Sequence, residues 1–185
     1  PIDEELMALL REHTPYWTTV IGLGDRSEAC DGDAFVDATY PAETLREIRA
    51  KDCAPLPPTS AAREQILSNN LPKYIANGAR LVLGTDAGID ARHAFGWADH
   101  HEMTRWVRSG ISPMDAIVAA TSRPAELIGI PDLGSVAVGK SADFLVLTAN
   151  PLEDIRNTRR IDKVFLRGTA LDRAAMPREF RQEGR

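Results

Sequence analysis

The sequence LVLGTDAG, residues 81–88, places a carboxylate directly after an apolar run. The run 81–83 is typical of a strand that is buried on both faces, as in a parallel sheet covered by helices. In a barrel of parallel strands, the side chains at the C-terminal ends of the strands form the reaction site. Asp86 falls at such an end, where it could bind a metal or act as a base. It could equally cap the next helix or take part in a turn, and these eight residues do not decide between the two roles.

Helix and strand signals alternate on the N-terminal side of Asp86. Acidic residues at a helix start, apolar residues at helical spacing and Gly or Pro stop signals mark the helices, whereas aromatic and β-branched residues mark the strands. Pro72 is expected to break or kink the second helix. Two helix–strand units predict an α/β protein. The predicted elements are a helix from Asp3 to the stop at residues 13–15, a strand over 16–23, a helix from Ser60 to the stop at residues 77–78, and a strand over 79–85.

Helical periodicity continues after Asp86 and then gives way to short strands. Ser112, Pro113 and Asp115 match the N-cap, N1 and N3 positions of a helix. From about residue 131 onwards the pattern indicates a small β module attached to the α/β body. The predicted elements are helices over 98–109, from 113 to about 122 and over 124–127, and strands within 134–140 and over 144–147 and 163–166.

Residues 24–58 interrupt the α/β pattern with a polar segment that is too long for an ordinary connection between a strand and a helix. A short helix is predicted from Pro41. The segment could form a lid or a binding loop, and surface decoration is an equally common role for such inserts. Cys30 and Cys53 are the only cysteines, and we expect two free thiols in a reducing compartment rather than a disulfide.

The composition is that of an ordinary soluble protein, with 43% hydrophobic and 26% charged residues over a length of 185. The net charge of -5 argues against a nucleic-acid partner. No apolar run approaches the ~20 residues that are needed to cross a membrane, and no signal peptide is recognisable. We therefore expect a cytoplasmic protein that binds neither nucleic acid nor membrane.

Metal-binding signals are sparse in this sequence. Neither HxH nor HExxH occurs among the four histidines. His100 and His101 are adjacent on a predicted helix and point about 100° apart, so they cannot hold one metal together. Arg92 and His93 lie in the loop after Asp86, close enough in sequence to face the same site, and are candidate substrate-binding residues. Asp86 is then the one plausible metal ligand, although zinc takes about four.

Several motifs in a fixed order together resemble the C-terminal part of the metal-dependent amidohydrolase superfamily. The most similar branches are imidazolonepropionase-like and Xaa-Pro dipeptidase-like. LGTDAG alone is a weak signal, but the order of the whole set is specific. The resemblance is strong over about residues 75–170 and looser over 1–23. The motifs are LGTDAG, His101-Glu102-Met103, GISPMDAIVAATSRPAELIGI, LGSVAVGKSADFLVLTANPLEDI and IDKVFLRG.

The resemblance implies an α/β fold that comprises the C-terminal part of a (β/α)8 TIM barrel and the C-terminal strands of a small β-sandwich. Residues 1–130 would supply barrel strands seven and eight with the insert at 24–58, residues 131–172 the sandwich strands, and residues 173–185 a tail. The superfamily's histidines on strands one, five and six, and its carboxylated lysine or acid on strand four, have no counterparts here. We therefore expect the N-terminal half of the barrel to come from the same or a separate chain, and this chain to be a cut or partial product.

The resemblance also implies a hydrolase with one or two divalent metals, usually zinc. Asp86 matches the aspartate after barrel strand eight, which binds the metal and takes a proton from the activated water. The implied reaction is hydrolysis of a C–N bond in a small-molecule amide, cyclic amide or dipeptide. The chain alone would be inactive, and a homo-oligomer is compatible with the sequence. Two alternatives stay open: a catalytically silent binding or assembly subunit, and a deaminase on the same scaffold.

Overall fold

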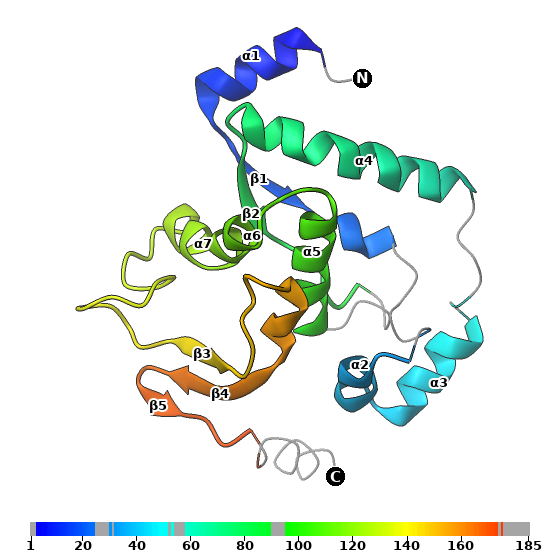
Figure 1. Ribbon diagram of the computed structural model, residues 1–185, viewed down its shortest axis with the longest axis vertical. Coiled ribbons are helices and arrows are strands. Elements are labelled where there is room, and N and C mark those ends of the chain that lie inside the picture. The colour runs from blue at the N-terminus through cyan, green and yellow to red at the C-terminus, as the bar shows by residue number, and fades with distance from the viewer. Residues whose placement is uncertain are drawn as a thin grey trace.

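The computed structural model describes residues 3–24, 30, 32–51, 53, 58–89, 95–173 and 175. Within these residues the chain is a mixed α/β arrangement, in which helices surround a pair of parallel strands and a three-stranded antiparallel sheet lies to one side (Figure 1). None of the described helices is long and apolar enough to cross a bilayer.

The parallel pair consists of β1 (Tyr16–Thr19) and β2 (Arg80–Leu83), which are aligned residue by residue. Because the alignment has no offset, the two strands end at the same edge of the sheet. Leu81 and Val82 point to opposite faces of β2, and both are buried. The prediction of a strand that is covered on both sides is therefore confirmed.

The first strand is shorter than the predicted strand over residues 16–23. It ends at Thr19, and Ile21–Gly24 forms a short 3-10 helix, η1. The backbone N–H groups of Ile21 and Gly22 donate to the Glu102 carboxylate. The Glu102 side chain, which is distant in sequence, therefore accepts hydrogen bonds from the N–H groups just beyond the strand end, where a longer strand would have continued.

Two helices cover the N-terminal part of the parallel pair. α1 (Glu4–His13) begins where expected, because the Asp3 side chain accepts a hydrogen bond from the Leu6 N–H at 2.9 Å. α4 (Pro58–Ala76) runs through Pro72 as one helix, so of the predicted break or kink at Pro72 the break does not occur. Packing holds α4 together, with Leu71 in the main core and the Tyr74 ring stacked on Trp17.

α5 (Trp97–Arg108) is the central helix and contacts η1, β2 and α4, as well as the later elements α6 and η3 described below (Figure 1). α6 (Pro113–Ala120) begins as predicted, with the Ser112 hydroxyl accepting a hydrogen bond from the Asp115 N–H at 3.1 Å. α7 (Ser122–Leu127) follows directly. α5 and α6 share the main core with η1, α4 and β2, and the core comprises Ile21, Leu71, Leu81, Met103, Trp106, Ile111, Ala116, Ala119 and Ile155.

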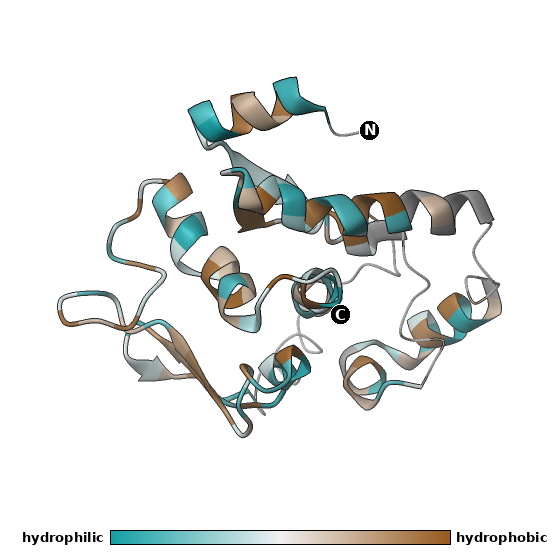
Figure 2. Ribbon diagram, turned by 45° about the horizontal axis from the view of Figure 1, so that its top comes forward, coloured by the Kyte–Doolittle hydropathy of each residue, from teal (hydrophilic) through white to brown (hydrophobic). Residues whose placement is uncertain are grey.

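The antiparallel sheet has the order β3 (Phe144–Leu147), β4 (Ile161–Leu166) and β5 (Thr169–Ala170), with η3 (Ile155–Arg159) between the first two strands. β3 consists of apolar residues only, whereas β4 also carries Asp162 and Lys163, and Figure 2 colours both strands by hydropathy. The strand that was predicted within residues 134–140 does not form. Val136 and Val138 in that segment are exposed, because no described strand pairs with them.

The insert folds into α2 (Ala34–Thr39) and α3 (Ala42–Lys51). α3 matches the helix that was predicted near Pro41, whereas α2 was not predicted. Cys30 and Cys53 form a disulfide with their Cα atoms 5.5 Å apart, so the expectation of two free thiols is wrong. The two cysteines are 23 residues apart, and α2 and α3, which lie between them, pack in one apolar cluster. The cysteines therefore give no support for a reducing compartment.

Candidate active site at the strand ends

Asp86 lies just beyond the end of β2, at the edge where both parallel strands end. Its φ of 52° is uncommon outside glycine, and its C=O accepts a hydrogen bond from the Ile89 N–H at 3.2 Å. The main chain of Asp86 thus opens a turn, whereas Gly96 and not Asp86 is the N-cap of α5. The Asp86 side chain is exposed, and within the described residues it has no hydrogen-bond or ion-pair partner. Its carboxylate is therefore available to a ligand.

Two glycines shape the backbone on either side of Asp86. A Cβ on Gly84 would lie 2.2 Å from Thr18 Cγ2 on β1, so only glycine lets the two strand ends approach this closely. Gly88 has a φ of 90°, and a Cβ there would lie 2.6 Å from Phe95 Cζ. Gly84 therefore allows the two strand ends to approach each other, and Gly88 allows the turn that follows. Together the two glycines hold Asp86 at the sheet edge.

Glu102 on α5 fixes the end of β1. It is completely buried, and its carboxylate accepts hydrogen bonds from Thr19 Oγ1 at 2.7 Å, Ile21 N at 3.0 Å, Gly22 N at 2.7 Å and Trp106 Nε1 at 3.0 Å. Burial raises the pKa of Glu102, and these hydrogen bonds oppose the rise because they favour the charged form. We call this arrangement the Glu102 clamp.

Sequence reasoning assigned no role to Glu102. The available signal was its spacing of four residues from Trp106, which places both side chains on the same helix face beside the apolar Met103. A glutamate on a buried face needs hydrogen-bond donors around it. The sequence could therefore have indicated a buried polar contact, but not that its donors come from the end of β1.

The three described histidines, His13, His100 and His101, do not gather around Asp86 as a ligand set. His101 is only 2% exposed and stacks on Trp97 with ring centroids 4.7 Å apart. His13 is exposed at the end of α1. The candidate substrate-binding residues Arg92 and His93 lie outside the described residues.

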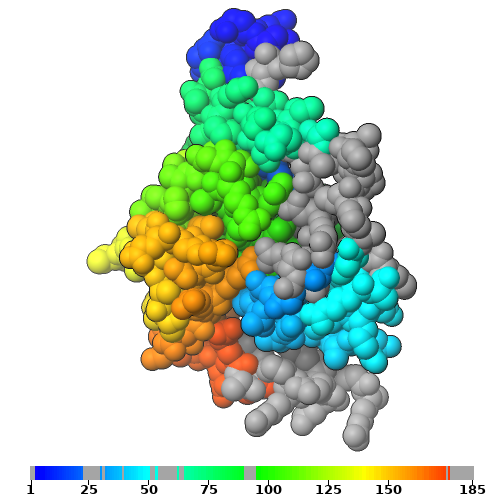
Figure 3. All heavy atoms as spheres, turned by 45° about the vertical axis from the view of Figure 1, so that its right-hand side comes forward, coloured from blue at the N-terminus to red at the C-terminus, as the bar shows by residue number. Residues whose placement is uncertain are grey.

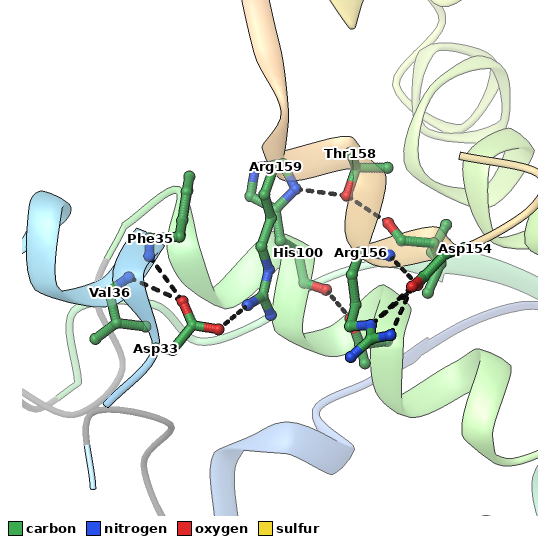
Figure 4. A network of polar contacts seen from close by, with 10 residues as sticks. Asp33, Phe35, Val36, His100, Asp154, Arg156, Thr158 and Arg159 are labelled. Carbon is green, nitrogen blue, oxygen red and sulfur yellow. Dashed lines mark hydrogen bonds and ion pairs between the residues drawn. The ribbon is translucent and has the colours of Figure 1, made fainter. Parts of the chain in front are cut away.

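A polar junction joins the insert to α5 and η3 (Figure 4). Asp33 caps α2 through Oδ1, and its Oδ2 accepts a hydrogen bond from Arg159 on η3 at 3.1 Å. The Phe35 ring packs against both the Arg159 guanidinium and the His100 ring, at 5.7 and 5.5 Å between centres. Thr158 lies 2.9 Å from His100 Nδ1 and donates its own proton to a backbone carbonyl, so His100 is the donor in that contact.

The junction makes His100 a pH-sensitive element of stability. Burial, together with the nearby Arg159 charge, lowers the pKa of His100 to about 4 from 6.5. Between these two pH values the unfolded chain binds a proton at His100 and the folded chain does not. Acidification through this range should therefore remove on the order of 2–3 kcal/mol of stability.

His100→Gln should remove this pH dependence, because glutamine does not titrate. We expect its free energy of unfolding, measured in urea, to fall less than that of the wild type between about pH 6.5 and 4. His13→Gln, at an exposed histidine, is the matched control and should follow the wild-type profile. Parallel pH profiles for the wild type and His100→Gln would contradict the assignment.

Asp86 fits a divalent metal as one ligand, because it offers an exposed carboxylate without a protein partner. In the part of the chain that the structure describes, no three His, Cys, Asp or Glu side chains lie close enough to hold a metal. A complete set of about four ligands would therefore need residues from outside this part of the chain.

Two parallel strands with a carboxylate beyond their shared C-terminal edge, covered by helices, define an α/β protein whose arrangement is consistent with part of a TIM barrel. The family model described as "Amidohydrolase family" matches residues 24–171. The chain belongs to this family.

The chain is also similar to individual curated proteins and solved structures. The chain is 34% identical over 111 residues to an adenine deaminase of Deinococcus radiodurans. The matched segment covers 60% of this chain and 20% of the relative. Among solved structures it is similar to a Xaa-Pro dipeptidase with bound methionine in the active site, with a TM-score of 0.62, 30% identity, and coverage of 92% of this chain and 37% of the other. A molinate hydrolase gives a TM-score of 0.64, 27% identity, and coverage of 96% and 37%. The chain therefore spans about a fifth of the length of the curated relative and 37% of either solved chain.

Proposed function

We propose that this chain forms the C-terminal part of a hydrolase that cleaves a C–N bond in a small molecule. The observation that carries this proposal is the exposed carboxylate of Asp86 at the shared edge of two parallel strands, without a partner among the described residues. Membership of the amidohydrolase family supports hydrolysis in general. A buried or ion-paired Asp86 would have favoured a purely structural role.

In this proposal Asp86 has two tasks. Its carboxylate would hold a divalent metal, zinc in our proposal, together with ligands from outside the described residues. When bound, such a metal supplies hydroxide near neutral pH, because it lowers the pKa of bound water to about 7. The Asp86 carboxylate would itself accept a proton and deliver it to the leaving nitrogen.

The proposal assigns residues 1–130 to a TIM barrel and residues 131–172 to a β-sandwich. The two described parallel strands cannot close a barrel, so the proposal requires further strands from outside the described residues. The solved chains support a need for further polypeptide, because the present chain covers only 37% of each. Arg92 and His93 remain proposed substrate contacts in the loop after Asp86.

An amide or dipeptide is the substrate class we propose first. Ile89 and Phe95, which flank the turn after Asp86, are exposed apolar side chains that would suit an apolar group of such a substrate. The similarity to a Xaa-Pro dipeptidase supports this choice. The second candidate is deamination, which the similarity to an adenine deaminase supports.

The proposal predicts a sharp difference between residues 1–185 alone and the whole protein that contains them. The isolated chain should bind no stoichiometric metal, hydrolyse nothing, and aggregate or associate, because β1 and β2 leave unpaired edges among the described strands. Metal analysis and size-exclusion chromatography of both preparations test this directly. Release of an amine or acid from dipeptides, or of ammonia from purines, separates the two candidate reactions.

Two outcomes would overturn the proposal. A well-folded monomer of residues 1–185 that carries zinc and shows amidase activity would refute the need for further polypeptide. A whole protein that binds metal but releases neither amine nor ammonia from any substrate would favour the silent binding subunit.

A further inference from the structure

We infer that Arg159 is a positioning residue, which holds the insert helix α2 beside Asp86 and thereby limits the size of substrate that the site admits. The substrate part of this inference rests on the proposed function. The positional part rests on contacts between segments that are far apart in sequence and can be tested without any activity.

The ion pair between Asp33 and Arg159 is a specific attachment between distant segments. The two residues are 126 positions apart, and their closest side-chain atoms lie 3.1 Å from each other. The Arg159 side chain is only 8% exposed, so its charge has lost most of its water. A desolvated charge depends on its partner far more than an exposed one does. Displacing α2 would therefore leave the Arg159 guanidinium buried without this carboxylate.

A second contact fixes the same helix at the same place. The Phe35 ring, two residues after Asp33, lies against both Arg159 and His100 (Figure 4). The surfaces of α2 and of the segment around η3 lie next to each other in the space-filling view (Figure 3). The N-terminal end of α2 is therefore held against η3 and α5 by an ion pair and by ring contacts.

A continuous apolar cluster connects this attachment to the candidate site. Val36 and Tyr40 on the insert pack with Trp97 and Ala98 on α5, and Ala87 packs against the same cluster. Ala87 is the residue directly after Asp86. Because Phe35 and Val36 are adjacent on α2, Arg159 determines how closely the insert approaches the strand end that carries Asp86.

The chain offers a matched control on the same 3-10 helix. Arg156 pairs with Asp154, two residues away, and its side chain is 64% exposed. Arg156 has the same charge as Arg159 and lies on the same element, but its ion pair with Asp154 joins two residues of one local segment. Exposed pairs of this kind contribute little to stability.

The test uses the whole protein and four variants that separate charge from helix capping. Asp33→Asn keeps a side-chain oxygen for the N-cap and removes the charge that pairs with Arg159. Arg159→Met removes the cation, Arg159→Lys retains it, and the double variant Asp33→Asn with Arg159→Met measures coupling. Arg156→Met is the control. Hydrogen exchange of the α2 amides and of Ala87 reports the position of the insert, and KM and kcat are measured on dipeptides with small and large side chains.

We expect Arg159→Met and Asp33→Asn each to speed exchange of the α2 amides about tenfold, with the double variant no worse than the more affected single variant. Arg159→Lys should restore most of the protection, and Arg156→Met should match the wild type. The variants that loosen α2 should change KM and raise the relative use of large dipeptides severalfold, while kcat on small dipeptides changes less than about twofold.

The outcomes separate the inference from the function on which it partly rests. Unchanged α2 exchange in Arg159→Met, or equal effects of Arg156→Met and Arg159→Met, would refute the positioning role. Faster exchange with an unchanged size preference would refute the link to substrate size. If the wild-type protein hydrolyses nothing, the proposed function fails, and the exchange data still decide whether Arg159 holds the insert.

Discussion

Replacing Asp86 by asparagine should lower kcat of the whole protein by about 10²–10⁴-fold, because the amide cannot accept and transfer a proton. Metal content should also fall, since asparagine is a weaker ligand than a carboxylate. The fold should persist, because the Asp86 side chain is exposed and forms no hydrogen bond or ion pair with the described residues. Steady-state kinetics, metal analysis and a thermal melt together check these three expectations.

Asp162→Asn is a suitable control for the Asp86 variant. Asp162 is an exposed aspartate on β4, away from the parallel strands, and the same chemical change there should leave kcat unaltered. An Asp86→Asn protein with near wild-type kcat would remove Asp86 from the proposed mechanism. A variant that fails to fold would instead show that Asp86 has a structural role.

Replacing Glu102 by alanine should lower the free energy of unfolding by about 2–5 kcal/mol. The change removes the acceptor of four hydrogen bonds in a site without solvent access. Thr19 and Trp106 can still bond to each other at 2.8 Å, so the main loss falls on the N–H groups of Ile21 and Gly22. Urea unfolding of the whole protein measures the effect.

Two comparisons make the Glu102 experiment specific. Glu47→Ala, at an exposed position of α3, should change stability by less than about 0.5 kcal/mol. The free energy of unfolding of Glu102→Gln should lie between those of the wild type and Glu102→Ala. The amide oxygen of glutamine still accepts hydrogen bonds, but its NH2 group faces other donors. Equal stability of Glu102→Ala and Glu47→Ala would show that the Glu102 clamp contributes nothing to the fold.

Local signals in the sequence predicted the parts of the fold that local physics determines. The Ser112 cap starts α6 as predicted, and α1 starts at the predicted acidic residues with Asp3 as its cap. Each cap involves residues at most three positions apart. The alternation of helix and strand signals predicted the α/β class. The prediction of a strand that is buried on both faces is confirmed by the burial of Leu81 and Val82. The position of Asp86 beyond β2 also followed from the sequence.

Features that depend on distant contacts could not be predicted in this way. β1 ends early because Glu102 takes its hydrogen bonds, and α2 is held by an arginine 126 residues away. The disulfide likewise depends on how α2 and α3 pair. The strand predicted within residues 134–140 fails for a related reason, since a strand pattern is realised only where a partner strand exists.

The Glu102 clamp also has a consequence for the order in which the chain can fold. Its contacts to Thr19, Ile21 and Gly22 span 83, 81 and 80 positions, so each closes a long loop. Contacts of such high sequence separation form slowly, because the entropy of loop closure must be overcome first. During synthesis the end of β1 leaves the ribosome well before α5 exists, and its two N–H groups must remain with water until then. The strand end beside Asp86 therefore reaches its final geometry late, after α5 has docked.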